Sequence, residues 1–275
     1  SEPDYDGGAD AGEDGNDGGD GPRATPSVAD GRVFVYDASL VLYAFDAASG
    51  KQLWKQDIAD DFDGKAIQWN NAASALVEGA HVFVVGGGED ESLLAFEAAT
   101  GKLAWKRGDE KMTHATPIAA TLHEKRQVIF FVQSGLIAVE PATGAELWRT
   151  EFPYRTSTAA SPVVSGDVVY CSAGYGVGAA AWRIDSKYGK LVPELLWRAA
   201  NKNINHWSTP IVHDGHLYGM FSFKEYGKGP LRCIELETGE EKWAREGFGP
   251  GNVILVGGTL VALSDKGELV LIDPR

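Results

Sequence analysis

One short phrase recurs five times along this chain and constrains its fold more than any other feature. Each copy places an acidic residue four positions before a glycine and a tryptophan after that glycine. The first copy reads AFDAASGKQLW (residues 44–54), and the turn glycines of the five copies are Gly50, Gly101, Gly144, Gly189 and Gly239. Consecutive glycines are 51, 43, 45 and 50 residues apart. A period of this length with one aromatic residue per repeat is typical of a β-propeller built from similar blades.

The residues around each phrase alternate as short strands. In the first repeat, Asp30-Gly31 is a tight-turn signal, and the segments 32–37, 40–46 and 52–58 read as strands. The last segment, 251–275, supplies three strands but no turn glycine or tryptophan. We therefore predict an all-β chain, a β-propeller of four-stranded blades with five complete blades and a partial sixth. The ring either closes at six blades or is part of a larger ring.

The recurring glycines and tryptophans have a structural interpretation. A glycine adopts positive φ at little cost, as a strand-to-strand turn of this kind requires. An indole buries roughly 150–250 Å² and can fill the space between neighbouring blades. We expect this docking role for the five turn glycines and for the tryptophans of the same repeats, Trp54, Trp105, Trp148, Trp197 and Trp243.

The charge of the chain is strongly acidic and unevenly distributed. The formal net charge is −14, which argues against a nucleic-acid partner. Eight acidic residues and no basic residue fall in the first twenty positions, so we expect residues 1–20 to be a flexible segment apart from the propeller at 21–275. Asp14, Asn16 and Asp20 offer oxygen ligands for Ca²⁺, but the spacing is not that of an EF-hand, and no metal site is predicted.

Cysteine usage and hydropathy add two further expectations. Cys171 and Cys233 each lie in an apolar, strand-like run, so they are expected to be buried free thiols, and a disulfide would depend on their geometry. No apolar run reaches eighteen residues, so no transmembrane segment is expected.

These repeats resemble the quinoprotein-type (PQQ-like) β-propeller repeat family, whose docking motif is A-x-D-x-x-T-G-x-x-x-W. The resemblance covers about residues 20–275. The segments DGPRATP (20–26), SAGYGVGAA (172–180), NHWSTPIVHDGHLYG (205–219) and GELVLIDP (267–274) are similar to a bacterial, often secreted subgroup. That subgroup is labelled by its similarity to the lipoprotein propeller of outer-membrane barrel assembly. The resemblance implies a periplasmic or secreted protein.

The same resemblance raises a catalytic alternative. Quinoprotein dehydrogenases of similar fold hold PQQ over the channel with Ca²⁺, a base aspartate and often an adjacent cysteine pair. This chain has no such cysteine pair, and no set of residues can be matched to the cation ligands. The prediction is therefore a non-catalytic extracytoplasmic scaffold without a cofactor and without catalytic residues. The alternative is a quinone-dependent oxidoreductase that uses PQQ with Ca²⁺.

Recognition is expected in the loops that precede the innermost strands, because these loops gather at one mouth of a propeller channel. Arg23 could bind a carboxylate through its planar guanidinium, and the aromatic side chains could wall a pocket for a sugar ring or a peptide. The bound partner would be a protein or a small polar ligand; the alternative is that these groups bind only channel water and neighbouring loops. The candidate residues are Arg23, Trp69, Asn70, Asn71, His114, Tyr175, Asn205, His206 and Trp207.

Overall fold

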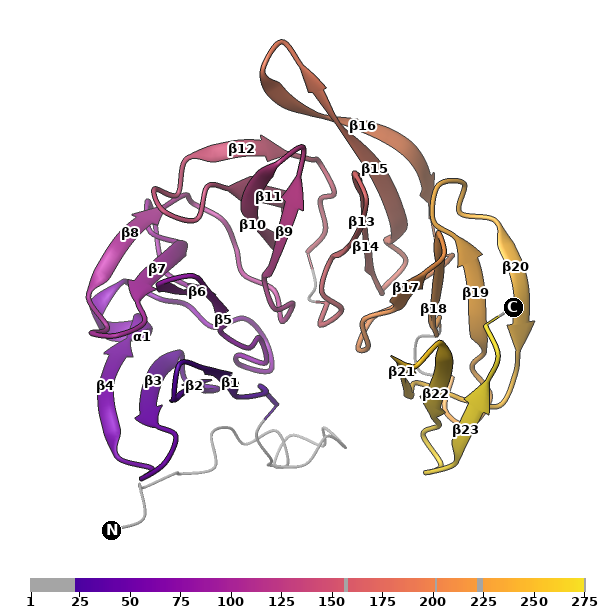
Figure 1. The fold of residues 1–275 in the computed structure, drawn as a ribbon, viewed down its shortest axis with the longest axis horizontal. Coiled ribbons are helices and arrows are strands. Elements are labelled where there is room, and N and C mark those ends of the chain that lie inside the picture. The colour runs from indigo at the N-terminus through magenta and orange to yellow at the C-terminus, as the bar shows by residue number, and fades with distance from the viewer. Residues whose placement is uncertain (1–22, 156–157, 201, 222–224, 275) are drawn as a thin grey trace. The chain divides into compact units, whose positions relative to one another are not determined.

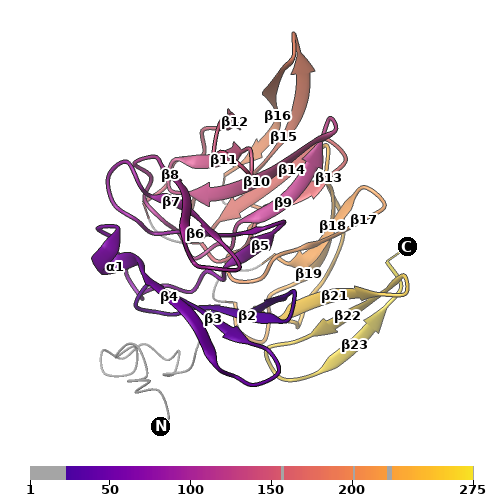
Figure 2. The ribbon, with the colours of Figure 1, turned by 60° about the vertical axis from the view of Figure 1, so that its left-hand side comes forward.

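The computed structural model describes residues 23–155, 158–200, 202–221 and 225–274. Almost all of its regular structure is antiparallel sheet, formed by strands that follow one another in sequence (Figures 1 and 2). One four-residue helix, α1 (Ile58–Asp61), follows the first sheet. Among the described residues, five sheets have four strands and the sixth has three, which confirms the predicted five complete blades and a partial sixth.

The strands divide among the sheets in chain order. The first sheet contains β1 (Ser27–Ala29), β2 (Arg32–Tyr36), β3 (Val41–Asp46) and β4 (Gln52–Asp57), and the second contains β5 (Leu76–Glu78), β6 (His81–Val85), β7 (Leu93–Glu97) and β8 (Leu103–Arg107). The third contains β9 (Ile118–Leu122), β10 (Lys125–Val132), β11 (Gly135–Val139) and β12 (Glu146–Arg149), and the fourth β13 (Val163–Ser165), β14 (Val168–Ala173), β15 (Gly178–Lys187) and β16 (Lys190–Ala199). The fifth contains β17 (Ile211–His213), β18 (His216–Met220), β19 (Leu231–Glu235) and β20 (Glu241–Arg245), and the sixth β21 (Asn252–Val256), β22 (Thr259–Leu263) and β23 (Leu269–Ile272).

The chain divides into two compact units. The first unit comprises the described parts of Ser1–Ala119, Arg126–Leu147 and Glu151–Ser157, and the second comprises those of Ala120–Lys125, Trp148–Thr150 and Thr158–Arg275. Each unit has its own apolar core between sheets. Phe34, Phe83 and Phe96 are buried in the first unit, and Tyr170 and Met220 are buried in the second.

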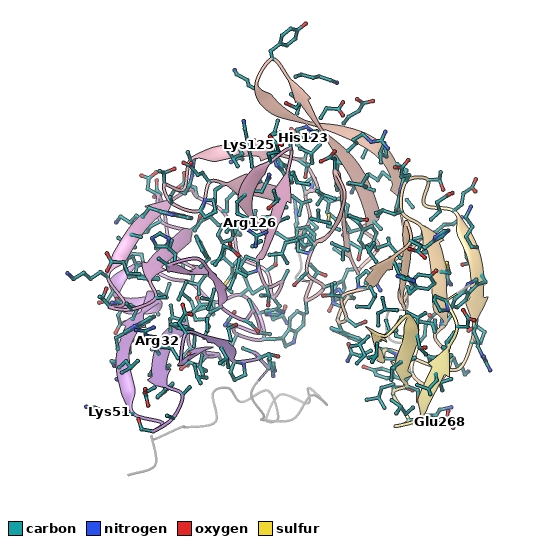
Figure 3. The ribbon with its side chains drawn as sticks, in the orientation of Figure 1. Arg32, Lys51, His123, Lys125, Arg126 and Glu268 are labelled. Carbon is teal, nitrogen blue, oxygen red and sulfur yellow. The ribbon has the colours of Figure 1, made fainter. Side chains whose placement is uncertain are left out.

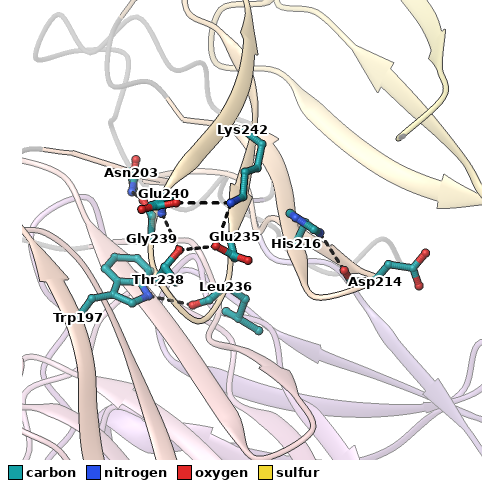
Figure 4. A network of polar contacts seen from close by, with 10 residues as sticks. All are labelled: Trp197, Asn203, Asp214, His216, Glu235, Leu236, Thr238, Gly239, Glu240 and Lys242. Carbon is teal, nitrogen blue, oxygen red and sulfur yellow. Dashed lines mark hydrogen bonds and ion pairs between the residues drawn. The ribbon is translucent and has the colours of Figure 1, made fainter.

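The recurring acidic residue and glycine close the same turn in four repeats. In the second sheet, the amide of Gly101 donates to the carbonyl of Glu97 (2.8 Å), and the Thr100 hydroxyl donates to the Glu97 carboxylate (2.6 Å). Gly101 has a φ of +74°, in the left-handed region. Figure 4 shows the equivalent turn after β19, where the Thr238 hydroxyl and then the Lys242 ammonium group hold the pKa of Glu235 below its ordinary value. The four-residue spacing is therefore a local hydrogen-bonding requirement.

Three tryptophans dock on the turn of the following repeat. The indole N–H groups of Trp54, Trp105 and Trp197 donate to backbone carbonyls at 3.1, 2.9 and 2.8 Å. In each case the acceptor residue directly follows the acidic residue of the next turn, as Figure 4 shows for Trp197 and Leu236. A Cβ atom built on the turn glycine would lie 2.6–2.7 Å from the indole, at Gly101, Gly144 and Gly239. We call this arrangement the Trp–turn contact; it leaves room for glycine alone.

The other docking residues have different surroundings. A Cβ atom on Gly50 or Gly189 would meet no atom within 4 Å. Gly189 lies at the end of the β15–β16 hairpin, whose strands have ten residues each and which reaches beyond the rest of its sheet (Figure 1). Trp148 is buried in the second unit, and the partly buried ring of Trp243 packs against Tyr218 with 6.0 Å between centroids.

Candidate functional site

A polar cluster in the first unit joins four of the predicted residues: Arg23, Trp69, Asn70 and His114. The Arg23 guanidinium donates to the Trp69 carbonyl at 2.6 Å, and Nε2 of His114 donates to the Asn70 carbonyl at 2.6 Å. The rings of Trp69 and His114 face each other at a tilt, with 6.5 Å between centroids. We call these four residues the first-unit cluster.

The loop that carries this cluster has an unusual backbone. Trp69 and Asn70 both have positive φ values, +69° and +58°, which non-glycine residues seldom adopt. Asn71 holds the loop in place: its amide group donates to the carbonyls of Asp37 and Ala73, both at 3.0 Å, and accepts from the Ala73 amide. Asn71 is buried, so its side chain holds the loop and does not face solvent.

The environment of His114 makes stability depend on pH. Burial lowers its pKa below the ordinary value, the hydrogen bond to Asn70 partly opposes this shift, and the positive charge of Arg23 adds to it. The unfolded chain therefore takes up a proton near pH 6.5, whereas the folded protein does so only at lower pH. The contribution of His114 to stability is present above pH 6.5 and is lost as the pH falls toward its folded-state pKa.

Replacing His114 by glutamine should flatten this dependence, because glutamine can still donate to the Asn70 carbonyl but does not titrate. Urea unfolding at pH 7.5 and pH 5.5 should show a smaller loss of unfolding free energy on acidification for His114→Gln than for the wild type. His81→Gln, in strand β6, is the control. An unchanged difference between the two pH values in His114→Gln would contradict the assignment.

An aromatic row lies in the second unit and consists of Tyr175, His206, Trp207 and Tyr226. Centroids of successive rings are 5.2, 5.4 and 6.2 Å apart. His206 is buried, whereas Tyr175, Trp207 and Tyr226 are 43%, 41% and 65% exposed. The buried imidazole thus lies between exposed rings, and the exposed rings of Trp207 and Tyr226 lie next to each other.

Buried polar contacts fix the loop that presents Trp207. Asn205 is buried, accepts from the Tyr170 hydroxyl at 3.0 Å and donates to the Met220 carbonyl at 3.2 Å. The carbonyl of His206 accepts from the amides of Ala159 and Ala160, while its Nδ1 accepts from the Gly174 amide at 3.2 Å. Asn205 and His206 thereby hold the backbone on which Trp207 stands.

The structure divides the nine predicted site residues into three groups. Four form the first-unit cluster, and three, Tyr175, His206 and Trp207, belong to the aromatic row. Asn71 and Asn205 lie inside the fold, where they bind backbone groups. Tyr226 was not predicted. The one sequence feature that could have pointed to it is its place as an aromatic residue in the charged, glycine-containing segment EYGKG at 225–229. The expectations for residues 1–20 lie outside the described residues.

A quinone bound with Ca²⁺ would need oxygen ligands for the cation. In the part of the chain that the structure describes, no three His, Cys, Asp or Glu residues come together in a way that could hold a metal ion. Cys171 lies on β14 and Cys233 on β19, and both are free and buried. Burial raises the pKa of the Cys171 thiol. The two thiols are therefore not the adjacent pair of the dehydrogenases.

None of the described helices has the length and hydropathy needed to cross a bilayer.

Comparisons with known proteins agree with this architecture. The sequence model of a family described as outer membrane protein assembly factor BamB matches residues 4–245. The protein of that name from Shewanella oneidensis is 27% identical over 270 residues, which cover 92% of this chain and 64% of the relative. The quinohemoprotein alcohol dehydrogenase ADH-IIG of Pseudomonas putida is 32% identical over 143 residues, covering 47% of this chain and 19% of the dehydrogenase.

Solved structures show the same fold. The crystal structure of BamB from Moraxella catarrhalis aligns with a TM-score of 0.65 and 17% identity, covering 92% of this chain and 74% of that one. The computationally designed protein Ika8 aligns with a TM-score of 0.58 and 10% identity. The chain has a β-propeller fold, and it spans 64% of the length of the Shewanella relative.

Proposed function

This chain belongs to the outer membrane protein assembly factor BamB family, and on that premise we propose that it is a non-catalytic propeller scaffold that binds a protein partner in the periplasm or outside the cell. Relatives that match over 270 residues carry the name of an assembly factor, whereas the dehydrogenase matches over 143 residues. The proposed partner takes part in outer membrane protein assembly.

The aromatic row is the observation that carries the proposal of a binding surface. Tyrosine and tryptophan are enriched at the energetically dominant positions of protein interfaces. Here three exposed rings, those of Tyr175, Trp207 and Tyr226, stand together. Because buried hydrogen bonds fix the loop of Trp207, little conformational entropy would be lost when a partner binds.

Removing the exposed rings of this row should abolish partner binding and leave the fold intact. We expect Trp207→Ala combined with Tyr226→Ala to lower the amount of outer membrane assembly proteins that co-purify with the tagged chain at least tenfold. The thermal midpoint should change little, because both side chains are exposed and neither belongs to the buried core clusters of the second unit. Quantitative co-purification from the native host measures the effect.

Tyr188→Asn is the matched control, because Tyr188 is an exposed tyrosine of the same unit outside the aromatic row. Undiminished co-purification with the double variant would show that the partner binds elsewhere. Reduction of a dye in the presence of PQQ, Ca²⁺ and an alcohol would favour the oxidoreductase alternative.

A further inference from the structure

The EYGKG loop, which carries Tyr226 of the aromatic row, is held at its base by backbone hydrogen bonds. The amides of Lys228 and Gly229 donate to the carbonyl of Glu225 at 3.1 and 2.8 Å and close a turn. The carbonyl of Gly229 in turn accepts from the amide of Phe248 at 2.9 Å. These bonds fix the part of the loop that follows Tyr226, but they do not include the tip.

The tip of this loop is bound by two charged side chains from the turn between β22 and β23. The Gly227 amide donates to the Asp265 carboxylate at 2.5 Å, and the Lys266 ammonium group donates to the Gly227 carbonyl at 3.2 Å. Within the described ranges of the chain, no other group binds the backbone of Gly227. A hydrogen bond from a backbone amide to an ionised carboxylate is stronger than one between neutral groups. We call these two bonds the Gly227 contact.

The close approach of the turn to the neighbouring backbone agrees with this contact. A Cβ atom built on Gly227, whose φ is +66°, would lie 2.7 Å from Cε of Lys266. A Cβ atom built on Gly249, whose φ is +61°, would lie 2.2 Å from the Asp265 carboxylate. Two glycines thus allow the charged side chains to lie directly against the backbone of the loops.

The turn that presents Asp265 is itself held in one conformation. Ser264 is buried, and its hydroxyl accepts from the amides of Lys266 and Glu268 at 3.3 and 3.1 Å. The Ser264 amide donates to the Glu268 carbonyl at 2.9 Å. The Asp265 amide donates to the Phe248 carbonyl at 3.0 Å, which joins the turn to the loop before the sixth sheet. The Asp265 carboxylate therefore extends from a fixed backbone.

Tyr226 depends on its backbone for its direction, because 65% of the residue is exposed and few neighbours can hold the ring. The ring lies 6.2 Å from that of Trp207, at a tilt of 30°. The loop of Trp207 is fixed separately, by the buried contacts of Asn205 and His206. The separation of the two rings is thus set by the EYGKG loop, whose tip places Gly227 directly after Tyr226.

We infer that Asp265 is a positioning residue for Tyr226: through the Gly227 contact it holds the Tyr226 ring beside Trp207 before a partner binds. A side chain that is already in its bound position loses less conformational entropy when the complex forms. Asp265 acts through the loop and does not touch the partner. The inference rests on the proposed function, because it gives Asp265 a role only in the surface that Trp207 and Tyr226 form.

Hydrogen–deuterium exchange of the Gly227 amide tests the positioning without any partner. Asp265→Ala removes the acceptor, so Gly227 should exchange about fivefold faster than in the wild type. Asp265→Asn keeps an acceptor oxygen and should exchange at nearly the wild-type rate. Glu268→Ala is the matched control, because Glu268 is an exposed carboxylate near the same turn (Figure 3) that binds Ser264 through its backbone alone. Unchanged exchange in Asp265→Ala would overturn the inference.

Co-purification of outer membrane assembly proteins tests whether the position of Tyr226 matters for binding. Asp265→Ala should lower the co-purified amount about fivefold, because the loop must then be ordered when the partner binds. The thermal midpoint should change little, since Asp265 is exposed. Glu268→Ala and Asp265→Asn should co-purify nearly as much as the wild type. Full co-purification with Asp265→Ala would contradict a positioning role.

A double-mutant cycle with Tyr226→Ala shows whether Asp265 acts through Tyr226. Once the ring is absent, Asp265→Ala should cause almost no further loss of co-purification. Losses that simply add would overturn the inference, because Asp265 would then act on the partner or on the whole sheet. Undiminished co-purification with Trp207→Ala and Tyr226→Ala combined would instead overturn the proposed function, and this inference with it.

Discussion

Replacing Gly144 by alanine is expected to lower the free energy of unfolding by about 3 kcal/mol. Gly144 has a φ of +70°, and an alanine there costs roughly 1–2 kcal/mol. Its Cβ atom would also lie 2.6 Å from the Trp105 indole, and overpacking of this kind costs about 1–3 kcal/mol. Denaturant unfolding of the two proteins in the same buffer measures the difference.

Gly50→Ala is the matched control for this substitution. Gly50 has the same φ of +70° and occupies the same place in its own turn, but an added Cβ atom would meet nothing within 4 Å. Gly50→Ala should therefore lower the free energy of unfolding only by the cost of a positive φ at alanine, roughly 1–2 kcal/mol. Equal losses for Gly50→Ala and Gly144→Ala would contradict the Trp–turn contact as the source of the larger effect.

Replacing Trp105 by alanine is expected to cost about 3–5 kcal/mol, the range observed for large aromatic residues in cores. The indole is 9% exposed, packs beside Phe83 and donates to the Pro141 carbonyl at 2.9 Å. Trp105→Phe should recover part of this loss, since it restores an aromatic ring but not the N–H donor. Denaturant unfolding again provides the measurement.

The two substitutions should also be coupled. Once Trp105 is alanine, the space beside Gly144 is open, so Gly144→Ala should cost no more than Gly50→Ala. A double-mutant cycle measures this coupling, and strictly additive losses would show that the indole and the glycine act independently.

The sequence predicted the sheets well because the repeated phrase encodes local hydrogen bonds. The acidic residue and the glycine must be four positions apart for the amide of Gly101 to reach the carbonyl of Glu97. The tryptophan four positions after the glycine then lies on the outer strand, where Trp54 and Trp105 are found. The requirements of turn and strand are therefore visible in a single sequence.

In the fourth repeat, the spacing between the glycine and the tryptophan did not predict the structure of the hairpin. Its gap between glycine and tryptophan is longer, and spacing cannot distinguish a longer loop from longer strands. The structure extends β15 and β16 together, so Gly189 lies at the end of the hairpin with no atom within 4 Å of an added Cβ. Pairing between the two strands, which is a non-local property, decides the outcome.

The surroundings of the candidate residues could be predicted only in part for a similar reason. Loop position and residue type made Arg23 and Trp207 candidates, but the burial of Asn71 and Asn205 depends on groups far away in the sequence. Asn71 binds the backbone of Tyr36 and Asp37, and Asn205 binds Tyr170. A residue type alone does not reveal such partners, and Tyr226 enters the row only because its loop folds beside Trp207.

The Trp–turn contact also has a consequence for the order in which this chain unfolds. The indole N–H groups of Trp54, Trp105 and Trp197 donate to the carbonyls of Ala98, Pro141 and Leu236, so each of these three contacts joins a repeat to the next one along the chain. Cooperativity in such an array passes from neighbour to neighbour, as in other repeat proteins. Removing one Trp–turn contact should therefore destabilise first the two repeats that it joins. Repeats that keep their contacts should unfold last.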